Sequence, residues 1–170
     1  MSNLKTNMNN FEDVFKSLKS QTLRICVIGI GRIGLPTALS FAKSGLDTVG
    51  VDINENLVQN INSGNFPLKD EPGYENIFKQ VLNEKTFSVT SKIEDAVPNC
   101  DLILLSLPTP MDENNIPDYS ALRSVATQLS DILSPNSLVI VESTIEPGFI
   151  ENEMISLISK SGRLKIEDNF

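Results

Sequence analysis

The amino-acid sequence contains no histidine and only two cysteines among its 170 residues. Without histidine, catalysis by a histidine acid or base and metal sites built on histidine ligands are excluded. The two cysteines, Cys26 and Cys100, both border apolar runs. Small residues in such surroundings are typically buried and reduced, so we expect no disulfide between them.

Basic residues are also scarce, since 14 lysines and arginines face 22 aspartates and glutamates and leave a net charge of −8. An acidic chain without a basic run is not expected to bind nucleic acid or an anionic membrane. No apolar run approaches the ~18 residues of a membrane span, and the first residues, MSNLKTNMNN, lack the apolar core of a signal peptide. We therefore expect a cytoplasmic protein.

The composition is otherwise that of a globular domain, with 40% hydrophobic and 21% charged residues. Short apolar runs are the main signal of strands. They occupy residues 25–28, 48–51, 102–105 and 138–141, and a weaker one occupies 87–90. The first four runs are continuous rather than alternating, which is typical of strands that are buried on both faces of a parallel sheet.

Apolar residues at helical spacing fill the gaps between these runs, over residues 35–42, 74–82 and 122–133. This alternation predicts an α/β fold, a Rossmann-type doubly wound parallel sheet in a single domain. A further apolar stripe at residues 11–18 predicts a short helix before the first strand. We divide the chain into a leading helical segment, residues 1–22, and a Rossmann domain, residues 23–170. A strand-like alternation also begins at Leu164-Lys165-Ile166.

The first predicted strand runs into a glycine loop that opens a helix, with the sequence Gly29-Ile30-Gly31-Arg32-Ile33-Gly34. In such a loop Gly29 permits a tight turn, Gly31 lets the backbone approach a pyrophosphate, and Gly34 lets helix and strand pack closely. The free N–H groups and the dipole of the helix start attract phosphate, so even an acidic chain can bind an anion there.

Asp52 is the acidic residue that this motif requires, because it ends the second predicted strand. Its carboxylate can accept hydrogen bonds from an adenosine ribose and repels a 2′-phosphate. Neither Ile53 nor Asn54 is basic, so NAD is favoured over NADP as the cofactor. From these residues alone, a glycine turn with an incidental aspartate or the cofactor loop of a methyltransferase is an alternative.

A series of motifs in order, from about Arg24 to Phe170, resembles the amino-terminal domain of the UDP-glucose/GDP-mannose dehydrogenase family, the nucleotide-sugar 6-dehydrogenases. They read ICVIGIGRIGLPTALSFAKSG, VGVDIN, NSGNFPLKDEPG, LLSLPTP, IPDYSAL and VIVESTIEPG. The Glu142-Ser143-Thr144 form of the last motif is most similar to the UDP-N-acetylmannosamine dehydrogenase branch. The resemblance implies two NAD-dependent oxidations that turn the C6 alcohol of a UDP-sugar into a carboxylate.

The resemblance also implies roles for particular residues. Gly29 to Gly34 would cradle the NAD pyrophosphate and Asp52 would bind the adenosine ribose. Without the resemblance, the glycine loop and the aspartate already predict these two contacts. The family often has Lys or Arg five residues after the acid, where this chain has Leu57.

At the other end of the cofactor, the resemblance implies that Pro108 and Thr109 line the site. Ser143 and Thr144 would contact the cofactor, with Thr144 bordering the nicotinamide and helping to position the catalytic water. From the residues alone, LPTP could be only a strand-ending turn, and Ser143-Thr144 only a helix cap.

The family's nucleophilic cysteine, its helper lysine and asparagine, and the sugar-nucleotide site follow the point where this chain ends, so we expect a fragment. The full-length enzyme is expected to be a homodimer or larger. One alternative is the cofactor domain of a β-hydroxyacid or 6-phosphogluconate dehydrogenase, which usually has a basic residue for NADP where this chain has Asp52. The other is a nucleotide-sensing regulatory module, which needs neither the LPTP nor the ESTIEPG motif.

Overall fold

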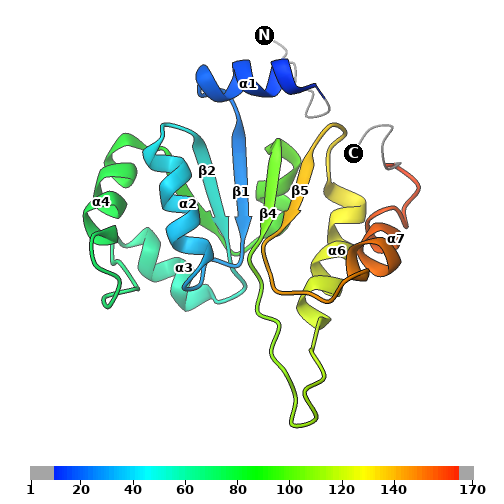
Figure 1. The fold of residues 1–170 in the computed structure, drawn as a ribbon. Coiled ribbons are helices and arrows are strands. Elements are labelled where there is room, and N and C mark those ends of the chain that lie inside the picture. The colour runs from blue at the N-terminus through cyan, green and yellow to red at the C-terminus, as the bar shows by residue number, and fades with distance from the viewer. Residues whose placement is uncertain (1–9, 165–170) are drawn as a thin grey trace.

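The apolar runs form a single parallel sheet in the computed structural model, which describes residues 10–164. Its strands are β1 (Arg24–Ile28), β2 (Asp47–Val51), β3 (Phe87–Thr90), β4 (Leu102–Leu105) and β5 (Leu138–Val141). They lie in the order β3-β2-β1-β4-β5, with helices on both faces (Figure 1). The predicted Rossmann-type doubly wound α/β fold in one domain is confirmed.

The central strand β1 shows why its run is continuously apolar. Ile25 and Val27 pack into the hydrophobic cluster on one face of the sheet. Cys26 and Ile28 point the other way, into the cluster on the opposite face. Because successive side chains of a strand alternate between faces, a strand covered on both sides needs apolar residues at every position.

Helices α2 (Gly34–Lys43), α3 (Glu55–Asn62) and α4 (Tyr74–Glu84) pack apolar residues into the cluster on one face of the sheet, on the β2 side of β1 (Figure 1). The periodic stripe of α2 buries Leu35, Ala38, Leu39 and Ala42, as its spacing predicts. Helix α4 adds Phe78, which is fully buried against Phe66. Asp52 lies at the start of the connection from β2 to α3. The sequence patterns did not predict helix α3.

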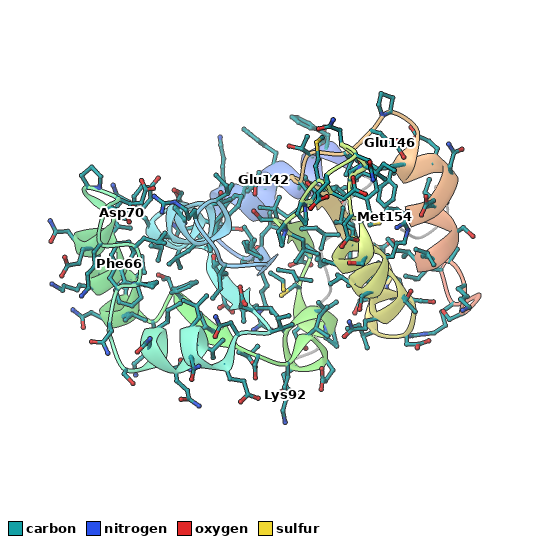
Figure 2. All side chains as sticks on the ribbon, turned by 90° about the horizontal axis from the view of Figure 1, so that it is seen from below. Phe66, Asp70, Lys92, Glu142, Glu146 and Met154 are labelled. Carbon is teal, nitrogen blue, oxygen red and sulfur yellow. The ribbon has the colours of Figure 1, made fainter. Side chains whose placement is uncertain are left out.

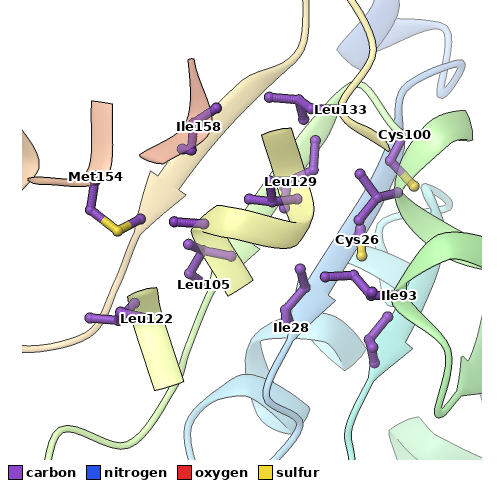
Figure 3. Close-up of a cluster of buried hydrophobic side chains, with 14 of the residues drawn as sticks. Cys26, Ile28, Ile93, Cys100, Leu105, Leu122, Leu129, Leu133, Met154 and Ile158 are labelled. Atoms are coloured by element: carbon purple, nitrogen blue, oxygen red, sulfur yellow. The ribbon is translucent and has the colours of Figure 1, made fainter. Parts of the chain in front are cut away.

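The opposite face is covered by α5 (Ile93–Ala96), the 3₁₀ turn η1 (Val97–Asn99) and α6 (Ser120–Ile132), with the π-helical η2 (Ile150–Met154) and α7 (Ile155–Ile158) beside them. Figure 3 shows Leu122, Leu129 and Leu133 of this cluster around Leu105 of β4. Leu164, the first residue of the predicted strand-like alternation, is buried. The rest of that alternation lies outside the described residues.

Both cysteines lie in this second cluster, in reduced form and fully buried, as predicted (Figure 3). The hydrogen bond with Cys100 and the burial of the thiol raise the pKa of Cys26 well above its ordinary value. A thiol with a raised pKa is a poor nucleophile, because the thiolate is the reactive form. Cys26 is therefore a packing residue of the core.

The expectation that every run is buried on both faces is wrong for β5. Leu138 and Ile140 are 43% and 39% exposed, whereas Val139 and Val141 pack against the second cluster. Strand β5 is one of the two edge strands of the described sheet, and its exposed side chains share the face on which α2 packs over β1 and β2. An apolar run does not distinguish an edge strand from a central one.

Helix α1 (Phe11–Lys19) lies across the amino ends of the strands (Figure 1). Asn10 caps it by accepting a hydrogen bond from the Glu12 N–H at 3.0 Å. Within the part of the chain that the structure describes, no residue of this helix is buried. The rings of Phe11 and Phe15 stack on each other. Within residues 10–164, no helix has the length and apolar character needed to cross a membrane.

Phe78 and Phe11 provide a matched test of this core. Phe78→Ala should lower the free energy of unfolding by about 3–5 kcal/mol, because it leaves a cavity under α4. Phe11 is 79% exposed, so Phe11→Ala should change it by less than about 0.5 kcal/mol. Urea denaturation measures both variants, and equal losses would contradict the assignment of the core.

Candidate functional site

The strand order changes direction at β1, and a cavity lies at this point of the sheet. From β1 the chain moves outward to β2 and β3 and then returns to β4 on the other side of β1. The loops that follow β1 and β4 therefore diverge at the carboxyl edge of the sheet, which is where open α/β sheets bind ligands. A cavity of about 760 Å³ lies there, within the range of small-molecule sites. Figure 2 looks onto this edge.

Most of the predicted site residues meet in the lining of this cavity. They are Gly29, Gly31, Arg32, Ile33, Asp52, Pro108, Thr109, Ser143 and Thr144. Ile30 and Gly34 are the predicted residues that lie outside the lining. Ile30 is buried in the core next to Gly50, and Gly34 is buried under the loop, so both shape the site from below.

The three glycines of the loop are constrained differently. Gly29 has a φ of +90°, and a Cβ on it would collide with the carbonyl group of Ser106. A Cβ on Gly34 would collide with the carbonyl oxygen of Gly29. A Cβ on Gly31 would meet no atom of residues 10–164 within 4 Å. The fold therefore requires glycine at the first and third positions, whereas the open space at Gly31 faces the cavity.

The start of α2 offers unpaired hydrogen-bond donors beside that open space. The N–H groups of Gly31, Arg32 and Ile33 have no acceptor among residues 10–164. Unpaired N–H groups at a helix start, together with the helix dipole, attract an anion. This corner of the cavity can therefore hold a phosphate group although the chain has a net charge of −8.

The carboxylate of Asp52 is fixed by two backbone donors. Its Oδ2 accepts a hydrogen bond from the Ile30 N–H at 3.1 Å, and its Oδ1 accepts one from the Asn54 N–H at 2.9 Å. The sequence motif does not reveal this second role, in which Asp52 ties the glycine loop to the start of α3. Each carboxylate oxygen keeps a further lone pair for a hydroxyl donor.

Ser143 joins the loops that follow β4 and β5. Its Oγ accepts a hydrogen bond from the Leu107 N–H at 2.9 Å and donates one to the Leu107 carbonyl at 2.8 Å. The reading of Ser143-Thr144 as a helix cap is wrong, because the next helical segment begins at Ile150 with Phe149 at its N-cap. Ser143 holds Pro108 and Thr144 on the same wall of the cavity.

Tyr119 supports the turn that carries Thr144, a role that the sequence analysis missed. Its hydroxyl accepts a hydrogen bond from the Glu146 N–H at 3.0 Å, and its ring packs on Phe149 with centroids 4.4 Å apart. Tyr119 is 4% exposed. It also immediately precedes α6, so it couples the turn to the helix that forms the far wall of the cavity.

Two further groups of lining residues were not predicted. The first, Ser91 to Glu94, follows β3, and the second lies on α6: Ala121, Ser124, Val125 and Gln128. A signal for the first group was present, because the carboxyl ends of parallel strands share one edge of the sheet. Lys92 is in this group, but its side chain points outward from the molecule in Figure 2.

Arg32 is the cation of the glycine loop, and it is paired at the rim of the cavity. Its Nη2 lies 2.6 Å from Oδ2 of Asp70 and 3.3 Å from Oε1 of Glu71. The hydrogen bond from Arg32 lowers the pKa of Asp70 below its ordinary value. Both acids belong to the connection between α3 and α4, so this ion pair joins two parts of the chain that are distant in sequence.

Comparison with known protein families gives a match over nearly the whole Rossmann unit. The model of the UDP-glucose/GDP-mannose dehydrogenase family, NAD binding domain, matches residues 23–170. The matched region contains the glycine loop, Asp52 and all the remaining residues that line the cavity.

Curated relatives are of the same kind. The UDP-N-acetyl-D-mannosamine dehydrogenase of Pyrococcus horikoshii is 38% identical over 129 residues, which are 76% of this chain and 30% of that protein. The enzyme of the same name from Campylobacter jejuni is 35% identical over 133 residues, 78% of this chain and 31% of that protein. The chain thus spans about 30% of the length of these relatives.

Solved structures agree with the fold. The UDP-D-ManNAc dehydrogenase from Pyrococcus horikoshii superposes with a TM-score of 0.77 at 36% identity, over 84% of this chain and 34% of that one. A ternary complex of GDP-mannose dehydrogenase from Pseudomonas aeruginosa gives 0.78 at 28% identity, over 84% of this chain and 33% of that one.

The glycine geometry predicts opposite effects of one substitution at two positions. Gly31→Val should leave the melting temperature within a few degrees of the parent, because the new side chain enters open space. Gly34→Val should destabilise the chain by more than about 3 kcal/mol, because it drives α2 away from the loop. Thermal melts followed by circular dichroism compare the two, and a Gly31→Val variant as unstable as Gly34→Val would contradict this geometry.

Proposed function

The chain belongs to the UDP-glucose/GDP-mannose dehydrogenase family and matches that family's NAD-binding domain, and we propose that it binds NAD while the full-length protein oxidises a nucleotide sugar. The main support for this proposal is the open space at Gly31 beside the N–H groups of residues 31–33, which precede α2 and have no acceptor among residues 10–164. Among residues 10–164, no atom lies within 4 Å of a Cβ placed on Gly31, so the backbone there is open to close approach by a ligand.

In this proposal the pyrophosphate lies over the glycine loop, on the N–H groups of Gly31, Arg32 and Ile33. The adenosine ribose donates hydrogen bonds to Asp52, which is already oriented by its two backbone donors. Ile53 is 94% exposed in the cavity lining and offers an apolar surface for the adenine ring. The negative charge of Asp52 disfavours a 2′-phosphate, so the site selects NAD over NADP.

The nicotinamide end of the cofactor lies along the wall formed by Pro108, Thr109, Ser143 and Thr144. When bound, NAD supplies the acceptor for a hydride. The hydrogen bonds of Ser143 to Leu107 hold this wall together. Thr144 is proposed to border the nicotinamide and to orient the catalytic water through its hydroxyl group.

We propose UDP-N-acetylmannosamine as the sugar nucleotide, because curated relatives named UDP-N-acetyl-D-mannosamine dehydrogenase match the chain at 35–38% identity. The full-length protein would oxidise its C6 alcohol to a carboxylate and would act as a homodimer or larger assembly. Residues 1–22 would form a leading helical segment and residues 23–170 the NAD-binding domain. The unpaired, buried thiols support a cytoplasmic location, since reduced cysteines persist there.

Cofactor preference tests the role of Asp52. The parent chain should bind NAD at least roughly tenfold more tightly than NADP, a difference of about 1.4 kcal/mol. Asp52→Asn should remove most of this preference, because it removes the charge that repels the 2′-phosphate while keeping one oxygen acceptor. Isothermal titration calorimetry with both dinucleotides measures the ratio. Equal affinity of the parent chain for NAD and NADP would contradict the assignment.

The chain by itself should bind NAD without turning it over. The first oxidation, of alcohol to aldehyde, requires a sugar-nucleotide site, which the family resemblance places beyond residue 170. Oxidation to the acid also requires a thiolate that captures the aldehyde, and both thiols of the chain are buried in the core, away from the cavity lining. We expect thermal stabilisation by NAD but no NADH absorbance with UDP-N-acetylmannosamine, UDP-glucose or GDP-mannose. Stoichiometric NADH production that persists in a Cys26→Ser/Cys100→Ser variant would overturn this account.

A further inference from the structure

The segment between α3 and α4 presents two carboxylates to the phosphate-binding loop. It is anchored to the core at Phe66, which is 8% exposed and packs on Phe78 with ring centroids 5.5 Å apart. Beyond this anchor, the Glu71 N–H donates to the Leu68 carbonyl at 3.0 Å and forms a turn. Figure 2 shows Phe66 and Asp70 on the same side of the molecule.

Arg32 is the residue that these carboxylates contact. Only its Nη2 is engaged, at 2.6 Å from Asp70 and 3.3 Å from Glu71. Its Nε and Nη1 have no partner among residues 10–164. A guanidinium group binds a phosphate best through two parallel N–H donors, so Arg32 has the chemistry to bind a phosphate that arrives at the adjacent Gly31.

The charges at this rim oppose such a phosphate. One guanidinium is shared by two carboxylates, so the cluster of Arg32, Asp70 and Glu71 has a net negative charge. The side chains of Arg32 and Asp70 are 65% and 64% exposed and that of Glu71 is 34% exposed, and ion pairs at the surface contribute at most about 1 kcal/mol each. An incoming phosphate group can therefore displace the carboxylates from Arg32 at little cost.

Building on the proposed function, we propose that Asp70 and Glu71 compete with the pyrophosphate of the dinucleotide for Arg32 and so set its affinity. Without ligand, the two carboxylates occupy the guanidinium group. With ligand, Arg32 turns to the phosphate and releases the segment of residues 67–73 from the glycine loop. Asp70 and Glu71 act through Arg32 and do not touch the cofactor.

A double substitution tests the competition. Asp70→Asn/Glu71→Gln should tighten NAD binding by roughly threefold to tenfold at low salt, because Arg32 becomes free for the phosphate. The gain should shrink at high salt. Glu75→Gln/Glu84→Gln removes the same charge from α4 without touching Arg32, since Glu75 pairs with Lys79 and Glu84 with Gln80. This control should bind NAD like the parent chain.

Repeating the double substitution in an Arg32→Ala background separates competition from general charge. Arg32→Ala alone should weaken NAD binding, and the acid substitutions should then add nothing. A gain that persists without Arg32 would contradict competition, as would unchanged or weaker binding by Asp70→Asn/Glu71→Gln in the presence of Arg32. Failure of the parent chain to bind NAD at all would instead overturn the proposed function.

Hydrogen exchange gives a readout that a purely structural ion pair would not produce. On saturation with NAD, amides of residues 67–73 should exchange faster, although amides of the glycine loop exchange more slowly. Slower exchange in both segments would show that the carboxylates stay on Arg32 when the cofactor binds, and would overturn the proposal.

Discussion

The contact between Gly34 and the carbonyl oxygen of Gly29 is the constraint on which the site depends. It brings the first turn of α2 against the end of β1 at a distance that admits no side chain. As a result, α2 begins at the point where the strand order changes direction, and the preceding N–H groups of Gly31, Arg32 and Ile33 have no acceptor within residues 10–164. A packing requirement of the fold thereby produces a local anion site in an acidic chain.

Elsewhere in the cavity, single residues likewise connect two segments of the chain and also face the ligand site. Asp52 connects the glycine loop to α3 through two backbone hydrogen bonds, and the same carboxylate is placed for a ribose. Ser143 connects the ends of β4 and β5, and the same turn carries Thr144. Because these residues both hold loops and face the cavity, substitutions that remove them change geometry as well as binding, and conservative replacements such as Asp52→Asn are more informative than alanine.

Much of this architecture could be predicted from the sequence, because buried parallel strands and the glycine loop have strong local patterns. The edge position of β5 could not, since an apolar run does not record which neighbours a strand has. Tyr119 and the pair formed by Asp70 and Glu71 were also missed as parts of the site. Their roles arise from contacts between residues 27 and 38–39 positions apart, which no local periodicity reveals.

The most direct test of the central claim is a calorimetric titration of NAD into the parent chain and into folded Gly31→Val. We expect saturable binding by the parent chain and loss of binding by the variant, because the valine side chain fills the space that the pyrophosphate would occupy. Parent-like affinity in a Gly31→Val chain whose circular dichroism and melting temperature match the parent would contradict it.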